Sequence, residues 1–247
     1  MKKFDIQAEQ YAFPYHYIPH LRADGTPMRA RSLRWGFEYL CYQLQAVELV
    51  RELKPESVLE VGCGDGRFIG MLQPHVARCM GVDLVPQAIQ FAAAFNPGVE
   101  FRCVDAAQLP GQFDVVAAIE VLEHIPDEHM AQFVRTLCER TRPGGHLLLC
   151  VPSDARPVQE KHYRHYNEAM LEAHAQSAGI RLERVLVQHV YAVPWWLKAL
   201  LKVTSNRSVS IEIAPLNRWL WKQVWRRRLS KPGRGAHILS VYRRAAG

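Results

Sequence analysis

The stretch Val58–Gly66, which reads Val-Leu-Glu-Val-Gly-Cys-Gly-Asp-Gly, decides the fold of this 247-residue chain. Its first half is an apolar run that predicts a buried strand, and a helical pattern, Arg67–Leu72, follows directly. Between the two lie Gly62, Gly64 and Gly66. Glycine lets the backbone turn sharply and lets a ligand approach main-chain N–H groups. The stretch therefore predicts a strand–loop–helix unit with a ligand at the loop.

Strand and helix signals alternate through the rest of the chain. The predicted strands are Ser57–Val61, Arg78–Asp83, Val99–Cys103, Phe113–Ile119, His146–Val151, Ile180–His189 and Ala236–Arg243. The predicted helices are Arg29–Leu53, Arg67–Leu72, Pro86–Phe95, Pro126–Arg140 and Asn167–Ala178, and Arg142–Gly145 predicts a turn. Near-continuous apolar strands separated by amphipathic helices favour a parallel sheet that is buried on both faces.

Two acids accompany the glycine loop. Asp83 falls where the second strand ends, and its carboxylate could accept two hydrogen bonds from a ribose diol or could cap the next helix. Glu60 would repel a pyrophosphate and attract a cationic ligand, or it could orient the loop by accepting from backbone N–H groups. Arg67 replaces the third glycine of the dinucleotide fingerprint, which disfavours a nicotinamide cofactor.

These residues together resemble motif I of the class I S-adenosylmethionine (SAM) methyltransferases. The resemblance covers Val47–Val151 and continues more weakly to Arg243. Asp105 resembles the acid that accepts from the adenine amino group, although a turn-forming role is the alternative. The cofactor-binding residues that the resemblance implies are Glu60, Gly62, Cys63, Gly64, Gly66, Asp83, Leu84, Asp105, Ala106 and Glu120.

The resemblance implies an α/β fold with a Rossmann-like, seven-stranded, mostly parallel sheet. The last strand is expected to be antiparallel, and helices are expected on both faces. We expect an N-terminal aromatic and helical lid over 1–46, a SAM-binding core over 47–192 and a basic, Trp-rich insertion over 193–235. Residues 236–247 then supply the last strand of the core.

A second polar constellation follows the fourth predicted strand. Glu120, Glu123 and His124 lie just past that strand, and His162 and His165 come later. The pattern looks like that of ubiquinone-pathway O-methyltransferases and, less closely, of small-RNA 2′-O-methyltransferases, in which two Glu and two His hold a metal. We expect His124, Glu120 and His165 to be catalytic, with His124 as a general base, because imidazole titrates near neutrality.

Metal binding is the alternative for this constellation. Two carboxylates and imidazoles form an O/N donor set that a divalent cation accepts. The residues that would hold it are Glu120, Glu123, His124 and His162. We do not expect a metal, because many methyltransferases of this fold carry a similar stretch that only shapes the pocket.

Charge divides the chain into two parts. From Arg184 onward there are 13 Lys/Arg and one acid, Glu212, although the whole chain carries +7. The insertion contains every tryptophan except Trp35 and mixes tryptophan with arginine as interfacial helices do. An anionic membrane surface is therefore one expected partner. The alternatives are RNA, which we favour less, packing of the tryptophans over the sheet edge, and a homodimer interface.

The remaining composition sets bounds on location. The six cysteines are scattered, which favours free thiols in a reducing compartment over disulfides. We see no signal peptide and no apolar run long enough to span a bilayer, so we expect a cytoplasmic protein, peripheral to the membrane at most.

The sequence favours a SAM-dependent methyltransferase that acts on a small or lipid-linked acceptor, at oxygen. The alternatives are a metal-assisted RNA 2′-O-methyltransferase, a nucleotide-binding oxidoreductase and a non-catalytic SAM-binding or nucleotide-binding protein.

Overall fold

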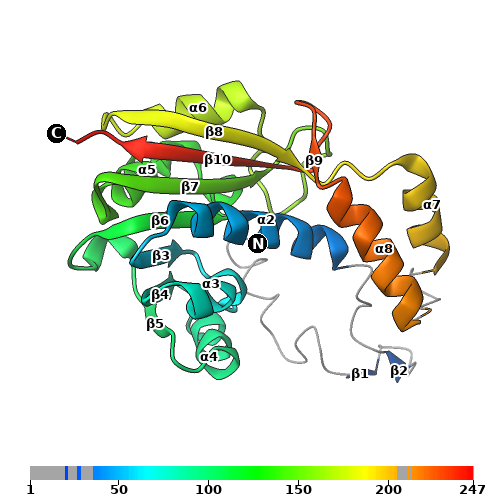
Figure 1. Ribbon diagram of the computed structural model, residues 1–247. Helices are drawn as coiled ribbons and strands as arrows, with labels where there is room; N and C mark the ends of the chain where they lie inside the picture. Colours follow the sequence, from blue (N-terminus) through cyan, green and yellow to red (C-terminus); the bar gives the residue numbers. More distant parts are fainter. Residues whose placement is uncertain (1–19, 22–26, 29–35, 205–210, 212, 247) are drawn as a thin grey trace.

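The computed structural model describes residues 20–21, 27–28, 36–204, 211 and 213–246 (Figure 1). Its centre is an eight-stranded sheet with the order β5-β4-β3-β6-β7-β10-β8-β9. These strands are β3 (Ser57–Val61), β4 (Arg78–Asp83), β5 (Glu100–Cys103), β6 (Phe113–Ile119), β7 (Thr141–Pro152), β8 (Leu182–Val190), β9 (Leu229–Ser230) and β10 (His237–Arg244). A separate antiparallel pair consists of β1 (His20–Leu21) and β2 (Pro27–Met28).

Strand direction confirms the predicted sheet. From β5 through β7 the neighbouring strands are parallel, whereas β10 is antiparallel to both β7 and β8. β10 therefore begins at the edge where the parallel strands end, and His237 pairs with Pro152 there. The insertion adds the unpredicted β9, which pairs with β8. Two residues are too few to show a strand period in the sequence.

Helices cover both faces of the sheet, as predicted. They are α2 (Phe37–Leu53), α3 (Arg67–Leu72), α4 (Pro86–Phe95), α5 (Asp127–Arg140), α6 (Glu168–Gln176), α7 (Trp195–Thr204) and α8 (Ala214–Arg226), with 3₁₀ turns η2 (Gln73–His75), η3 (Ala106–Gln108) and η4 (Leu122–His124). Val115 of β6 packs in a core with α2 and α3, whereas Val116 packs in a second core with α5 and α6. Adjacent residues of a strand point to opposite faces, so both faces must be covered by apolar groups.

One predicted turn is wrong in kind. Arg142–Gly145 lies inside β7, which begins at Thr141 and not at His146. Gly144 has a φ of +75°, and the pairing with β6 shifts register between Phe113 and Val115. The left-handed glycine therefore produces an irregularity within a continuous strand, because the residues on either side still pair with β6.

The N-terminal prediction can be compared with the structure only in part. α2 begins at Phe37, and residues 29–35 of the predicted helix lie outside the described residues. The predicted aromatic lid lies outside them as well, apart from Gly36, the start of α2 and the backbone of β1 and β2.

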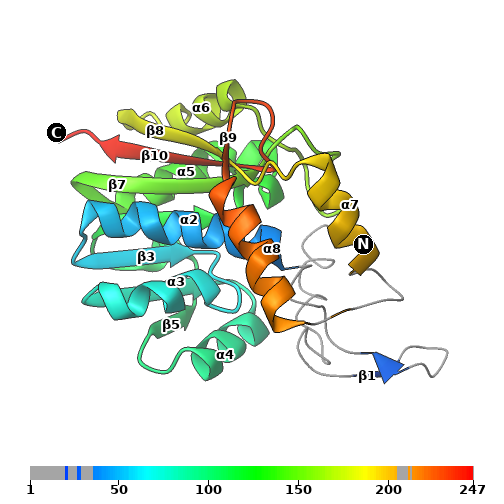
Figure 2. The same cartoon turned by 45° about the vertical axis from the view of Figure 1, so that its right-hand side comes forward.

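The insertion forms two helices at the carboxyl edge of the sheet (Figure 2). α8 packs on α2, where Leu220 and Val224 are buried and the rings of Phe37 and Trp221 lie 5.5 Å apart. Trp225 stacks on Trp221 at 5.6 Å. Part of the tryptophan set thus packs on the body of the protein. Within the described residues, no helix is both long enough and apolar enough to span a bilayer.

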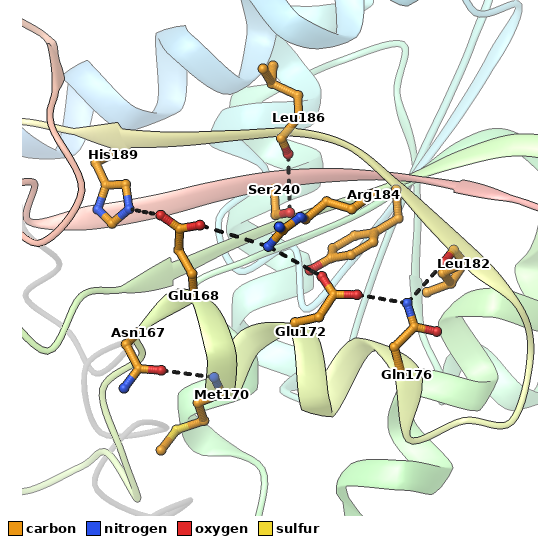
Figure 3. Close-up of polar contacts among 11 residues, drawn as sticks. Asn167, Glu168, Met170, Glu172, Gln176, Leu182, Arg184, Leu186, His189 and Ser240 are labelled. Carbon is orange, nitrogen blue, oxygen red and sulfur yellow. Dashed lines mark hydrogen bonds and ion pairs between the residues drawn. The ribbon is translucent and has the colours of Figure 1, made fainter.

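A polar network fixes α6 against β8 (Figure 3). Glu168 accepts a hydrogen bond from His189 Nε2 at 2.9 Å and lies 3.8 Å from Arg184. Glu172 pairs with Arg184 at 3.5 Å and accepts from Gln176 at 2.9 Å. We call these five residues the α6–β8 network.

Candidate active site

The glycine loop connects β3 to α3 at the carboxyl edge of the sheet. Gly62, Gly64 and Gly66 have φ values of +74°, +53° and +72°, a region that L-residues with a Cβ rarely adopt. A Cβ on Gly62 would lie 2.6 Å from Val121 Cγ2, which follows Glu120 in the second constellation. The loop and the second constellation are therefore in direct contact.

Glu60 points from β3 into the first turn of α3. Its buried Oε2 accepts a hydrogen bond from the Ile69 N–H at 3.1 Å. Burial raises the pKa of Glu60 well above its ordinary value, with a further increase from the charges of Asp65 and Asp83. This geometry matches the loop-orienting alternative, and a direct contact of Glu60 with the cofactor stays a prediction.

Asp83 joins the loop to the next helix. Its Oδ2 accepts from the Gly64 N–H at 2.9 Å, and its Oδ1 accepts from the Val85 N–H at 2.9 Å. Burial raises the pKa of Asp83, although its hydrogen bonds with backbone N–H groups oppose that increase. The carboxylate lies beside the loop as the resemblance requires, and its bond to the start of α4 also fits the capping alternative. The ribose contact stays a prediction.

The remaining residues predicted to hold the cofactor lie on the neighbouring strand ends. Asp105 caps η3 through a 2.8 Å bond from the Ala107 N–H, which is the turn-forming alternative, and its contact with adenine stays a prediction. Ala106 and Cys63 are buried, whereas the Leu84 side chain is exposed.

Glu120 is part of a buried chain of charges that the sequence did not reveal. Its Oε1 accepts from His237 Nδ1 at 3.0 Å, and His237 Nε2 donates to Glu38 at 3.0 Å. Glu38 also pairs with Arg156 at 2.6 Å. Glu120 itself has a φ of +57°, a costly conformation for a residue other than glycine. We call Glu38, His237, Glu120 and Arg156 the carboxyl-edge chain.

The charge state of His237 follows from this geometry. Burial alone would lower the pKa of its imidazole, but the charges and hydrogen bonds of Glu120 and Glu38 raise that pKa to about 9. His237 is therefore an imidazolium at neutral pH. Burial raises the pKa of Glu38, but His237 and Arg156 outweigh that effect and hold it below its ordinary value.

Glu123 lies next to this chain in a different state. Its side chain is fully buried, and neither carboxylate oxygen has a hydrogen-bond partner among the described residues. Burial, assisted by the charge of Glu120, raises the pKa of Glu123 well above its ordinary value. A buried polar group without a partner is costly, so its presence indicates a functional role.

Hydrogen bonds fix the tautomers of the three nearby histidines. His124 Nδ1 lies 3.1 Å from the Lys161 carbonyl, and His165 Nδ1 lies 3.0 Å from the Arg156 carbonyl. A carbonyl only accepts, so both Nδ1 atoms are donors. His165 Nε2 then accepts from His162 Nδ1 at 2.9 Å. In the neutral rings, Nε2 of His124 and of His162 therefore carries the lone pair.

The roles predicted for these residues separate in space. Both ring nitrogens of His165 are bonded, so its geometry favours orienting His162 over taking a proton from substrate. Ligand atoms of Glu123, His124 and His162 lie within 4.8 Å of one another, whereas Glu120 groups with Cys150 and His237. The four residues considered for a metal thus divide into a set of three and a separate Glu120.

The set of three has the chemistry of a divalent-metal site. One carboxylate and two imidazole nitrogens suit Zn²⁺ or Mn²⁺, and each imidazole is oriented through its other nitrogen, as metal-ligating histidines are. His124 Nε2 lies 3.8 Å from Glu123 Oε1. A cation at this point would also resolve the unpartnered carboxylate of Glu123.

Comparison with known proteins identifies the family. A profile described as a methyltransferase domain matches residues 32–188. The chain belongs to this family. That membership confirms the resemblance seen in the sequence, with SAM as the cofactor, and it replaces the oxidoreductase alternative.

Individual relatives agree with this assignment. The chain is 35% identical over 111 residues to a ubiquinone biosynthesis O-methyltransferase of Albidiferax ferrireducens, a match that covers 40% of this chain and 43% of that protein. A protein of the same name from Xanthomonas euvesicatoria is 30% identical over 169 residues, covering 58% of this chain and 70% of that protein. The chain therefore spans less than half the length of the first of these relatives.

A solved structure shares the fold. The N-methyltransferase NodS from Bradyrhizobium japonicum, in complex with S-adenosyl-L-homocysteine, superposes with a TM-score of 0.62 at 18% identity. The superposition covers 99% of both chains. At this identity the likeness shows the methyltransferase fold alone.

Proposed function

We propose that the chain transfers the methyl group of SAM to a hydroxyl oxygen of a small or lipid-linked acceptor. The contact between the glycine loop and the Glu120–His124 segment carries this proposal, because it joins a cofactor loop to a base. Val121 packs against Gly62, and His124 follows within the same short segment. The relatives named as O-methyltransferases favour oxygen as the acceptor atom.

The loop residues bind and orient the cofactor in this proposal. Bound SAM supplies an activated methyl group. Gly62–Gly66 leaves the main chain open to the ligand, Asp83 accepts from the ribose hydroxyls and Asp105 accepts from the adenine amino group. Glu60 holds the loop in shape through its bond to Ile69. Alignment of donor and acceptor in a dry site then provides much of the rate.

His124 removes the proton of the acceptor hydroxyl. Its Nδ1 is held as a donor by the Lys161 carbonyl, so Nε2 is the atom that can accept. When the acceptor oxygen forms its new bond to the methyl carbon, the hydroxyl proton moves to this nitrogen. Such general-base help contributes about 10²–10⁴-fold to rate.

A methyl-transfer assay tests the proposal. Radiolabelled SAM is supplied with catechols, polyprenylated phenols, amines and RNA, and mass spectrometry locates the methyl group. We expect O-methylated phenol. His124→Gln should lower kcat at least about 100-fold with unchanged S-adenosylhomocysteine affinity. The control is His129→Gln, an exposed histidine on the nearby α5.

Three outcomes would contradict this assignment. N-methylated amine would move the acceptor atom from oxygen to nitrogen. Methylated RNA ends would favour the RNA 2′-O-methyltransferase alternative. Tight binding of S-adenosylhomocysteine without any methylated product would favour the non-catalytic alternative.

A metal-assisted reaction is the second candidate, supported by the unpartnered carboxylate of Glu123. Glu123, His124 and His162 would hold the cation, which would lower the pKa of an acceptor hydroxyl. Elemental analysis of the purified protein and Mn²⁺ or Zn²⁺ titration by calorimetry test this candidate. Binding should be lost in His162→Gln and kept in His129→Gln. Absence of stoichiometric metal and of titratable affinity would remove the metal and leave His124 as the base.

A further inference from the structure

The exposed side of α7 combines apolar and basic side chains. Trp195 and Val203 are 81% and 69% exposed, and Lys198 and Ala199 are exposed between them. The spacings of three, four and eight residues place all four on one side of a helix. The opposite side is used for packing, since Leu197 is fully buried. α7 thus presents large apolar groups to solvent although it has a buried side available.

The exposed side of α8 is more basic. Arg218, Lys222 and Arg226 are exposed and lie four residues apart, so they form a row along the helix. Trp219, beside this row, is 45% exposed. The inward side again carries buried apolar residues, Leu220 and Val224.

The two exposed sides are joined by aromatic contacts. The ring centroids of Trp196 and Trp219 lie 6.4 Å apart, and the guanidinium of Arg227 lies 5.8 Å from the Trp196 ring. α7 and α8 therefore form one surface, which we call the α7–α8 surface. Its residues are Trp195, Trp196, Lys198, Val203, Arg218, Trp219, Lys222, Arg226 and Arg227.

The position of this surface relates it to the active site. α7 and α8 lie at the carboxyl edge of the sheet, the same end as the glycine loop and η4 (Figure 2). α8 packs against α2, whose first turn contributes Glu38 to the carboxyl-edge chain. A partner bound at the α7–α8 surface would thus lie at the end of the molecule where the acceptor enters.

We propose that the α7–α8 surface docks on an anionic phospholipid bilayer. The basic row supplies charge complementarity to lipid headgroups, and the exposed Trp195 and Val203 supply apolar groups that enter the headgroup–acyl boundary. Tryptophan with basic side chains on one side of a helix, and a buried apolar side beneath it, is typical of proteins that lie on a membrane. The proposal does not depend on the acceptor atom or on the metal.

Vesicle co-sedimentation tests this surface with the full chain. We expect the protein to pellet with vesicles of phosphatidylcholine and phosphatidylglycerol, to stay in the supernatant with phosphatidylcholine alone, and to be released by high salt. The triple variant Arg218→Glu, Lys222→Glu, Arg226→Glu should bind at least about 100-fold more weakly, since each basic group near an anionic surface contributes about fivefold.

Matched controls separate docking from net charge and from folding. The variant Arg51→Glu, Arg135→Glu, Arg181→Glu makes the same charge change at exposed positions of α2, α5 and the segment before β8, and it should keep nearly all vesicle binding. Trp195→Ser should weaken binding at high salt more than at low salt, because it removes only the apolar part. Thermal shift with S-adenosylhomocysteine should be the same in all variants, which shows that the methyltransferase body is intact.

Four results would overturn the proposal. The first is failure of the wild-type chain to pellet with anionic vesicles at low salt. The second is equal weakening by the two triple variants. The third is RNA binding without vesicle binding, which would assign the surface to nucleic acid. The fourth is a dimer in light scattering that Trp195→Ser dissociates, which would assign it to a second copy.

Discussion

Two polar networks in this protein use the same residue types in different surroundings. In the α6–β8 network the side chains of Glu168 and Glu172 are 34% and 33% exposed, and each carboxylate has partners. At the carboxyl edge, Glu120 and Glu38 bracket a buried imidazolium, and Glu123 has no hydrogen-bond partner among the described residues. Partly exposed, paired carboxylates hold a helix in place, whereas buried and incompletely paired carboxylates indicate a reaction site.

The largest difference between the networks should appear when their histidines are removed. His237→Ala leaves Glu38 and Glu120 buried without their shared cation, so we expect a loss of about 3–5 kcal/mol in the free energy of unfolding. His189→Ala, the matched change in the α6–β8 network, should cost about 1 kcal/mol, because Glu168 keeps water and Arg184 as partners. Urea denaturation measures both. Equal losses would remove the distinction between the networks.

The pH dependence of stability should report the same imidazolium. The folded-state pKa of His237, about 9, lies above its unfolded value of about 6.5, so the folded protein holds the proton more tightly. Its contribution is complete below pH 6.5 and is lost as the pH rises through 9. We expect the wild type to lose about 3 kcal/mol over that window. His237→Gln should lose much less, and parallel urea curves for the two proteins would contradict the assigned charge state.

Glu123→Gln should separate stability from function. The folded-state pKa of Glu123 lies above its unfolded value, so its favourable contribution is present below about pH 4.5 and is lost as the pH rises. The amide avoids an ionisation cost, so the variant should gain about 1–2 kcal/mol at pH 7 and nothing near pH 4. Methyl transfer or metal binding should fall in the same variant. A variant that is destabilised at pH 7 would show that Glu123 is an ordinary structural carboxylate.

The fold was largely predictable because its signals are local. Periodicity alone located Val58 and Val115 in strands, and both lie in the core. The exceptions were β9, which is too short to show a period, and Gly144, whose left-handed φ resembles a turn but lies within β7. A single positive φ does not determine whether the flanking residues continue to pair.

The site was predictable only where its residues are contiguous. Glu120, Glu123 and His124 form one motif, so their proximity is determined by the backbone. Glu38 and His237 are 199 positions apart, and they meet because β10 enters the sheet beside β7 in the antiparallel direction. His237 was not recognised because a histidine at the start of a strand carries no signal of its partners.

The smallest effect should come from the exposed carboxylates. Glu168→Gln removes the charge that faces Arg184 at 3.8 Å and keeps an acceptor for His189 Nε2. Because Glu168 is about one third exposed, solvent screens its ion pair, and we expect a loss of less than about 1 kcal/mol that shrinks further at high salt. Urea curves at low and high salt provide the measurement. A loss as large as that of His237→Ala would mean that partial exposure does not distinguish the α6–β8 network from the carboxyl-edge chain. The assignment of the reaction site would then depend on the unpartnered Glu123 alone.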